Sequence, residues 1–305
     1  MMKAKAFRVL IIGLGDIAMG YDNGREDVTW THVGALLKNK NFEIIGGVDP
    51  VTTTHAKFYA LTSAPVFEDV DEFVLANEQI VDLVVICSPT KYHFHHYKKI
   101  KLLKPKLVLM EKPLVSLDDD LESLMVEINS GPRVMVNLFR LYQSQINSVL
   151  QELANSGPCR ITIRYSKSIE HNGIHFITLL LRYFGRCLKQ ECITLPNEVA
   201  HSFTFEQAEV LMVPAFQDMD DNSMVLQSNM GTTYYLNGGR IFFQVDHQHN
   251  RHDFNLDEFK HHMAKVYEQC LQVIQGKDDD SLALAHSGHK LLMKGAHYYE
   301  KLHAL

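Results

Sequence analysis

A glycine-rich stretch near the start of the chain has the residue types and spacing that bind phosphate groups. Gly13-Leu14-Gly15-Asp16-Ile17-Ala18 has the form G-x-G-x-x-A and directly follows the apolar run 7–12. After a strand, the first glycine permits a tight turn, the second lets the main chain approach a pyrophosphate, and the alanine allows the next helix to pack closely. We therefore expect Gly13, Gly15, Asp16, Ile17 and Ala18 to bind a dinucleotide.

An aspartate at the end of the second apolar run is placed to select the form of that dinucleotide. Asp49 follows Gly46-Gly47-Val48, the position whose carboxylate hydrogen-bonds the adenosine ribose in such folds. Because a carboxylate repels a 2′-phosphate, the sequence favours NAD, with NADP as the alternative. Asp49 comes later than the usual ~20 residues after the loop. An insertion at about 19–31, which holds the only tryptophan, accounts for the delay and is expected beside the cofactor.

The elements that position these residues alternate between apolar strands and helices. Strands are expected at 7–12, 42–48, 81–87 and 107–110, with helices between them at 32–40, 53–61, 70–77 and 92–103. This alternation predicts right-handed crossovers and a doubly wound parallel sheet. Glu111-Lys112-Pro113 directly follows the strand at 107–110. Its side chains should therefore lie at the carboxyl edge of the sheet, where ligands bind in open α/β folds.

The remainder of the chain has a different pattern. A helix is expected to start near Ser116 and Asp119 and to end at 130–132, followed by a strand at 133–139, a helix at 143–154, a strand at 160–165 and a helix at 174–184 ended by Gly185. Short β-prone runs between 188 and 245 indicate an antiparallel sheet, and helices follow at 256–275 and 281–303. We predict an α/β protein with a Rossmann domain at 1–118 and an α+β domain at 119–305. The second domain has a large, mainly antiparallel open sheet, and the last helix can pack back on the first domain.

Composition narrows the class of partner. The 305 residues are 46% hydrophobic and carry a formal net charge of −6, so there is no basic footprint for nucleic acid. No run approaches the ~20 apolar residues that span a bilayer, which argues against a membrane partner. The five cysteines are odd in number and form no C-x-x-C pair, which argues against both a disulfide framework and structural zinc. These features indicate a cytoplasmic protein that acts on a small molecule.

Four motifs together resemble the glucose-fructose oxidoreductase / inositol dehydrogenase / MocA family. They are the glycine loop, Ser88-Pro89-Thr90-Lys91-Tyr92-His93, Glu111-Lys112-Pro113, and Asn137 with Arg140, and the likeness covers essentially the whole chain. The resemblance implies an NAD(P)-dependent dehydrogenase or reductase that acts on a sugar, sugar nucleotide or cyclitol. It also implies cofactor contacts from Asp49, Ser88, Pro89, Thr90, His93, Glu111 and Lys112, and a homodimer or homotetramer formed through the C-terminal sheet.

The same resemblance assigns catalytic roles. In the family the lysine of the E-K-P motif is catalytic and a D-x-x-x-H pair completes the site, so that Lys112 and His175 match, whereas His171 stands in place of the aspartate. Thr178 stands where many members carry another aspartate. The stretch 165–173 resembles a branch associated with surface-sugar biosynthesis. Substrate contacts are expected from Asn137, Arg140, Tyr165, Lys167 and Asn172.

Oxidation of a secondary alcohol needs a base for the hydroxyl proton while hydride leaves the same carbon. His175 is the natural base, since an imidazole exchanges protons near neutral pH. Lys112 could polarise the oxygen as a cation or, with its pKa lowered by burial, take the proton itself. The sequence leaves both roles open. His171 in place of a carboxylate removes a negative charge, so we expect a different acid–base balance from inositol dehydrogenases.

Three other interpretations remain open at this point. His171 and His175 could lie one helical turn apart and bind a metal, although no acidic partner is near them in the sequence. The family resemblance also permits a non-catalytic dinucleotide-binding sensor or regulator. A non-redox hydrolase or isomerase that uses the nicotinamide only transiently is the third alternative. We expect no metal site and an enzyme.

Overall fold

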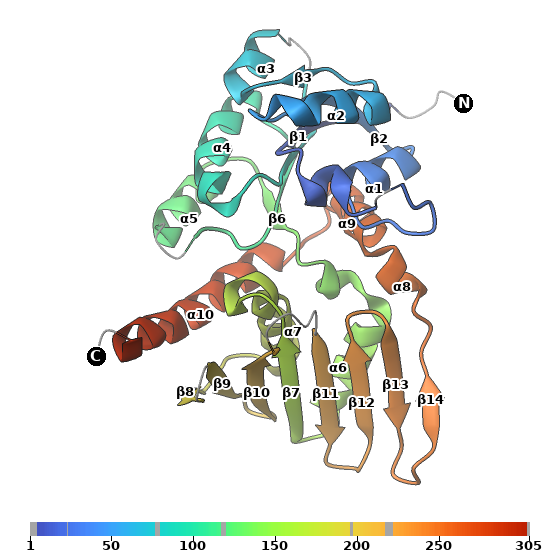
Figure 1. The fold of residues 1–305 in the computed structure, drawn as a ribbon, viewed down its shortest axis with the longest axis vertical. Coiled ribbons are helices and arrows are strands. Elements are labelled where there is room, and N and C mark those ends of the chain that lie inside the picture. Colours follow the sequence, from blue (N-terminus) through green and yellow to red (C-terminus); the bar gives the residue numbers. More distant parts are fainter. Residues whose placement is uncertain are drawn as a thin grey trace. The chain divides into compact units, whose positions relative to one another are not determined.

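The chain divides into two units that differ in extent from the predicted domains. The structure is a computed structural model that describes residues 5–22, 24–76, 80–116, 120–195, 198–216 and 222–303, with side chains as far as residue 293. The first unit contains residues 1–139 and 260–282, and the second contains 140–259 and 283–305 (Figure 1). The predicted boundary at 118 therefore falls inside the first unit. Each unit is described by itself.

Short apolar runs build the sheet of the first unit. Its strands are β1 (Phe7–Ile12), β2 (Phe42–Val48), β3 (Val66–Phe67), β4 (Leu83–Ile86), β5 (Leu107–Met110) and β6 (Val134–Val136). All pairs are parallel, in the order β3-β2-β1-β4-β5-β6. Every residue of β4 and β5 is buried, as expected for strands covered on both faces. The predicted doubly wound sheet is confirmed, and its order reverses between β1 and β4, the point where such sheets bind ligands.

Helices cover both faces of this sheet. They are α1 (His32–Lys38), α2 (His55–Thr62), α3 (Val70–Ala76), α4 (His93–Ile100), α5 (Leu121–Asn129) and α9 (His262–Ile274). Two adjacent glycines of β2 face helices on opposite sides of the sheet. A Cβ at Gly47 would meet Phe58 of α2, and a Cβ at Gly46 would meet Phe73 of α3. α9 packs against α1 and β5. Short helical turns lie at η1 (Asp16–Gly20), η2 (Thr52–Thr54), η3 (Thr90–Tyr92), η4 (Lys101–Leu103), η5 (Phe139–Tyr142) and η6 (Ile169–Gly173).

Two helix starts are fixed by capping side chains, and only that of α5 differs from the predicted one. α5 begins at Leu121, with the Asp120 carboxylate accepting the Ser123 N–H at 3.1 Å; the predicted start used Asp119, which lies outside the described residues. α1 begins at His32, capped by Thr31, whose Oγ1 accepts the Gly34 N–H. The carboxylate of Asp22 accepts the Trp30 N–H at 2.7 Å and the Thr31 hydroxyl. The insertion is therefore tied to the start of α1, and its place beside the cofactor stays a prediction.

A mixed eight-stranded sheet forms the second unit. Its strands are β7 (Cys159–Tyr165), β8 (Lys189–Thr194), β9 (Val199–Thr204), β10 (Ala208–Pro214), β11 (Ser223–Ser228), β12 (Thr233–Asn237), β13 (Ile241–Val245) and β14 (Arg251–Asp253). They lie in the order β14-β13-β12-β11-β7-β10-β9-β8. Only β7 and β10 pair in parallel among the described strand pairs, so the prediction of a mainly antiparallel sheet is confirmed. Burial alternates strictly along β7, which shows that one face is covered and the other open.

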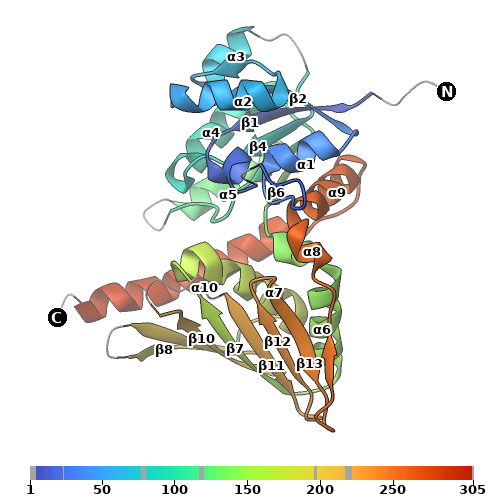
Figure 2. The ribbon, with the colours of Figure 1, turned by 45° about the vertical axis from the view of Figure 1, so that its right-hand side comes forward.

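The covered face packs against helices (Figure 2). These include α6 (Ser144–Asn155) and α7 (Ile174–Phe184), which ends at Gly185 with φ of +72° as predicted. Tyr234 of β12 donates its hydroxyl to Glu152 of α6, and the ring of Phe184 lies 6.4 Å from that of Phe205. Outside this layer the chain continues as α8 (Asp257–Lys260) and ends with α10 (Ser281–His303).

The C-terminal helices differ from the prediction in two ways. The single helix expected at 256–275 is broken into α8 and α9, because His261 between them has ψ of 29°, outside the helical region. The helix that belongs to the first unit is α9, whereas α10 belongs to the second unit from residue 283 onward. Among the described helices, none is long and apolar enough to cross a membrane.

The contact between β2 and α2 can be tested by adding one methyl group. A Cβ at Gly47 would lie 2.8 Å from Cε1 of Phe58, which is fully buried. We expect Gly47→Ala to destabilise the protein by about 1–3 kcal/mol through overpacking, measured by urea unfolding. In a Phe58→Leu background the same substitution should cost clearly less. Equal costs in the two backgrounds would show that the ring does not restrict position 47.

Candidate active site

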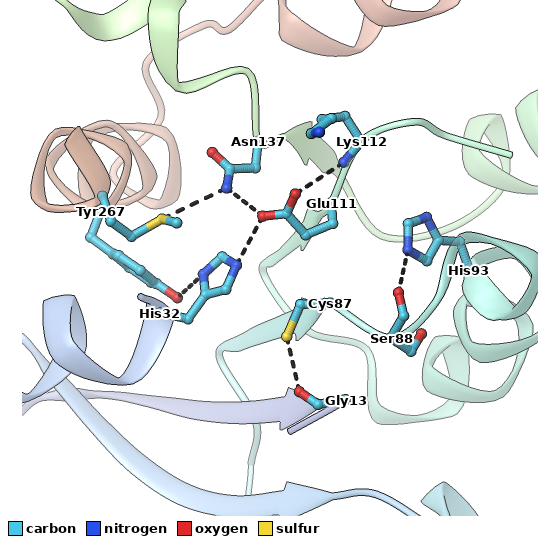
Figure 3. Close-up of polar contacts among 10 residues, drawn as sticks. Gly13, His32, Cys87, Ser88, His93, Glu111, Lys112, Asn137 and Tyr267 are labelled. Carbon is cyan, nitrogen blue, oxygen red and sulfur yellow. Dashed lines mark hydrogen bonds and ion pairs between the residues drawn. The ribbon is translucent and has the colours of Figure 1, made fainter. Parts of the chain in front are cut away.

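The glycine loop is held against the ends of β2 and β4. The Gly13 N–H donates to the Val48 carbonyl at 2.8 Å, and the Cys87 thiol donates to the Gly13 carbonyl at 3.1 Å (Figure 3). Burial raises the pKa of Cys87 well above its ordinary value, so the thiol keeps its proton. Gly13 has φ of +93°, and a Cβ there would lie 2.4 Å from the main-chain nitrogen of Ser88. Only glycine can occupy this position.

The next glycine borders open space. A Cβ at Gly15 would meet no atom within 4 Å, and Gly15 itself is exposed. The N–H groups of Ala18 and Met19 donate to the Gly15 carbonyl at 3.1 Å, and Ala18 is fully buried, as its predicted packing role requires. Asp16 is exposed and Ile17 half-buried in η1, a single turn that directly follows Gly15. This arrangement leaves room for a pyrophosphate beside the loop.

Asp49 closes the loop from the end of β2. Its Oδ2 accepts the Leu14 N–H at 2.6 Å, and its Oδ1 accepts the Val51 N–H at 2.8 Å. A carboxylate has about four acceptor sites, so both oxygens can still accept a ribose hydroxyl. Together with the space beside Gly15, this acceptor fits a dinucleotide with an unmodified ribose.

Ser88 and His93 follow β4 at the same edge of the sheet. The two ring nitrogens of His93 lie 2.9 Å from the Ser88 carbonyl and 3.1 Å from the Pro113 carbonyl. Burial lowers the pKa of His93, although both carbonyls favour the protonated ring, which alone can donate both bonds. The ring thus links two loops at this edge. The Ser88 hydroxyl is 2.9 Å from Nδ1 of His96, while Pro89 is exposed and Thr90 half-buried.

Glu111 directly follows β5 as a buried carboxylate surrounded by donors. Its Oε1 receives hydrogen bonds from the Asn137 amide and from Nε2 of His32, 3.1 Å away, and its Oε2 accepts the Lys112 N–H at 3.3 Å (Figure 3). Burial would raise the pKa of Glu111, but the hydrogen bond and electrostatic interaction with His32, the charge of Lys112 and the Asn137 amide lower it below its ordinary value. Glu111 is therefore an anion next to Lys112, which is itself half-buried.

His32 and Tyr267 are the residues of this region that the sequence did not predict. His32 begins α1, Tyr267 lies in α9, and both are fully buried, with Nδ1 of His32 2.9 Å from the Tyr267 hydroxyl. His32 stands in a stretch predicted only as a helix, and no motif pairs it with Tyr267, 235 residues later. In the sequence, the one available signal for this contact was a histidine at the start of the first predicted helix.

The second unit collects the predicted substrate residues, apart from Asn137. Arg140 is buried with its guanidinium carbon 4.7 Å from the Phe176 ring centroid, and burial lowers its pKa to about 10. Tyr165 is buried at the end of β7, where burial and the charge of Glu170 raise its pKa. These two residues belong to the same unit as the predicted histidines.

The remaining predicted site residues lie in the turn after β7 and at the start of α7. Lys167 is exposed with φ of +64°, and the Asn172 amide donates to the carbonyl and hydroxyl oxygens of Ser166, each at 3.0 Å. His171 is half-buried in η6, where its N–H donates to the Ser168 hydroxyl oxygen. His175 follows as a buried residue in the first turn of α7.

Thr178 takes part in the helix itself. Its hydroxyl donates to the Ile174 carbonyl at 2.9 Å and lies 3.2 Å from the His175 carbonyl, and the side chain is fully buried. A threonine satisfied by its own helix needs no outside partner at this position, where a carboxylate would need one. Within the described residues no cluster of three or more His, Cys, Asp or Glu side chains could hold a metal ion, and His247, His249 and His252 are exposed.

The sequence comparison identifies the first unit. The family described as "Oxidoreductase family, NAD-binding Rossmann fold" (GFO_IDH_MocA) matches residues 7–138, which contain the glycine loop, Asp49, Glu111 and Asn137. Residues 7–138, the NAD-binding part of the chain, therefore match this family. The predictions of the family, of an NAD(P)-dependent oxidoreductase and of a nicotinamide dinucleotide cofactor are thereby confirmed. No curated protein matches the chain.

Solved structures show the same fold over nearly the full length. A dehydrogenase from Chromobacterium violaceum has a TM-score of 0.77 at 15% identity, covering 99% of each chain. A dehydrogenase (MviM) from Clostridium difficile has a TM-score of 0.74 at 15% identity, covering 96% of this chain and 100% of that one. A 3-ketoreductase from Actinomadura kijaniata, in complex with NADP and TDP-benzene, has a TM-score of 0.70 at 15% identity, covering 93% and 95%. At these identities the likeness concerns the fold.

The two loop glycines should respond differently to one added methyl group. Gly15→Ala meets no neighbour in the protein itself, so stability should stay within about 1 kcal/mol of the native value. The methyl occupies the space left for the pyrophosphate, so the NADH dissociation constant should rise at least about tenfold, or 1.4 kcal/mol. Calorimetric titration and urea unfolding measure the two effects. Gly13→Ala, which collides with the main chain of Ser88, should lose stability as well as binding, and native affinity in Gly15→Ala would contradict the placement.

Proposed function

We propose that the protein transfers a hydride between nicotinamide and a hydroxyl or keto carbon of a sugar, sugar nucleotide or cyclitol, in the formation of surface sugars. The observation that carries the proposal is the position of Lys112. It follows β5 at the carboxyl edge of an NAD-binding sheet, beside a buried carboxylate and on the same edge as the glycine loop and Asp49. A lysine at this edge can act on the oxygen of a substrate next to the nicotinamide.

The chain's own residues handle the substrate oxygen and its proton. The bound nicotinamide takes up or gives the hydride at the carbon that bears this oxygen. In the oxidation direction the hydroxyl proton passes to a base, for which we propose His175, while Lys112 stabilises charge on the oxygen. We propose His171 as a further catalytic residue, since it precedes His175 by one turn. Its imidazole replaces a carboxylate, so it supplies no fixed negative charge at neutral pH.

The proposed substrate class rests on polar residues of both units. Asn137 and Arg140 leave the end of β6, and Tyr165, Lys167 and Asn172 lie at and after the end of β7. Amide, phenol and cationic groups of this kind bind hydroxyl-rich or anionic ligands. Among solved structures of similar fold, the 3-ketoreductase is in complex with TDP-benzene, and an oxidoreductase from Agrobacterium radiobacter is in complex with L-tartaric acid. Both ligands are polar small molecules, which supports this class.

We base the proposed assembly on the sheet of the second unit and the proposed compartment on the cysteines. The open face of its sheet carries apolar and aromatic side chains, among them Leu211 of β10 and Tyr235 of β12, which are 36% and 37% exposed. We propose that this face pairs with a second copy in a homodimer or a homotetramer, since open sheets bury one face. The described cysteines are all thiols, which supports a cytoplasmic location.

The choice between NAD and NADP depends on the charge of Asp49. Asp49→Asn keeps an oxygen that can accept the Leu14 N–H but removes the negative charge that repels a 2′-phosphate. We expect the ratio of NADH to NADPH affinity to fall at least about tenfold, equivalent to 1.4 kcal/mol. Parallel fluorescence titrations with the two cofactors measure this ratio. An unchanged ratio would show that the carboxylate does not set the preference.

The substitution Lys112→Met distinguishes an enzyme from a sensor. The substitution removes the amine but keeps the length of the side chain, so turnover with a panel of sugars and sugar nucleotides should fall at least about a hundredfold. Cofactor binding should stay within threefold of the native value. The control is Lys40→Met, an exposed lysine before β2 that should leave turnover unchanged.

Each alternative function has its own outcome. A sensor would bind the cofactor and show no turnover with any sugar in either redox form, before or after substitution. A reaction with transient oxidation would show no net NADH, but would exchange deuterium from solvent at the carbon beside the oxidised one. Either outcome would replace the proposed net oxidoreduction.

A further inference from the structure

A chain of buried hydrogen bonds leads from α9 to the main chain of Lys112. It runs from the Tyr267 hydroxyl to Nδ1 of His32, and from Nε2 of His32 to Oε1 of Glu111 (Figure 3). The side chain of His32 is fully buried and that of Glu111 nearly so. The other carboxylate oxygen accepts the main-chain N–H of Lys112. All four residues lie in the first unit.

The bonds of Tyr267 determine the direction of this chain. Among the described residues, His32 is the only hydrogen-bond partner of the Tyr267 hydroxyl, and burial raises the pKa of Tyr267 well above its ordinary value. When the phenol donates to Nδ1 of His32 and Nε2–H of His32 donates to Glu111, each buried donor of the chain has an acceptor. An unmet buried donor costs about 1–3 kcal/mol, so this direction satisfies the chain.

Glu111 is the carboxylate at the end of this chain. It accepts hydrogen bonds from His32 and Asn137 and from the main-chain N–H of Lys112. Burial raises the pKa of Glu111, whereas the hydrogen bond and the electrostatic interaction with His32 lower it, and so does the charge of Lys112, the residue that follows it. Cys87, Tyr21 and His93 also lie in the field of Glu111, which raises the pKa of the first two and opposes the lowering of the third.

We infer that Tyr267 and His32 are positioning residues that keep Glu111 an oriented anion beside Lys112, so that Lys112 enters the reaction as an ammonium ion and not as the base. The inference deepens the proposed function and rests on it. It decides between the two roles that the sequence leaves open for Lys112. In the direction of reduction, the ammonium can give a proton to the substrate oxygen as hydride arrives at carbon, and in oxidation it stabilises the alkoxide after the proton has left to the base.

The charge of Lys112 can be measured without cofactor or substrate. Acetic anhydride acylates only the neutral amine, so the acetylation rate of Lys112 relative to exposed Lys40, followed by peptide mass spectrometry at pH 8, reports how firmly the proton is held. We expect Glu111→Gln to raise this ratio about tenfold, the effect of one unit of proton affinity. Glu43→Gln, an exposed carboxylate on β2, is the matched control and should leave the ratio unchanged. A ratio in Glu111→Gln within twofold of the native value would overturn the inference.

Two substitutions at His32 separate positioning from packing. The amide nitrogen of glutamine can take the place of Nε2, whereas that of asparagine takes the place of Nδ1. His32→Asn removes the donor that offsets the burial of Glu111, so its carboxyl should gain a proton and the labelling ratio should rise at least threefold. His32→Gln keeps the donor and should stay within twofold of native. Equal ratios in the two variants would show that His32 only fills space.

The phenol and the turnover give a further comparison. Tyr267→Phe leaves Nδ1 of His32 without its hydrogen-bond partner and should raise the labelling ratio less than His32→Asn does. With an active substrate, His32→Asn should lower kcat at least about tenfold with the NADH dissociation constant within threefold of native. A fall confined to cofactor affinity would contradict a role through Lys112. The labelling outcome stands even if no substrate is found, so a failure of the proposed function and a failure of this inference are distinguishable.

Discussion

The buried carboxylate of Glu111 is the constraint on which the first unit depends. Removing one partner from a buried charge costs about 3–5 kcal/mol, because the charge is left uncompensated. The donors come from the start of α1, the chain after β6 and the residue after β5, and α9 supplies the phenol behind them. One charge therefore ties together elements that are far apart in the sequence. It also places a fixed negative charge beside the lysine of the site.

The other strand ends of this sheet are joined by equally specific contacts. Gly13 approaches Ser88 so closely that no side chain fits between them, and Asp49 and Cys87 hold the loop from the neighbouring strands. These contacts fix the edge of the sheet where the dinucleotide is expected. The proposed substrate residues of the second unit lie on β7, η6 and α7, a different part of the chain. One fold can carry different functions, because the sites placed on it can differ.

The sequence predicted the parts of the fold that local patterns determine. The apolar strands, the glycine loop, the doubly wound parallel sheet and the end of α7 at Gly185 were accessible, because each depends on neighbouring residues or on a motif of fixed spacing. The break at His261 and the extent of the first unit were not, since both depend on contacts made after folding. The same holds for the site. Lys112 and Glu111 were found from their motif, whereas His32 and Tyr267 meet across 235 residues, and no pattern in one sequence relates them.

The return of α9 to the first unit has a consequence for biosynthesis. The helix that supplies Tyr267 and the buried Cys270 is separated from the rest of its unit by residues 140–259. The chain leaves the ribosome from its N-terminus, so α1 and β5 are synthesised long before α9. The surfaces that α9 covers on them stay exposed until nearly the whole protein has been made. Residues 140–259 of the second unit are in effect an insert within the first. A single cut at residue 139 would therefore not release a complete nucleotide-binding domain, and a fragment that ends there would expose the apolar surface that α9 normally covers.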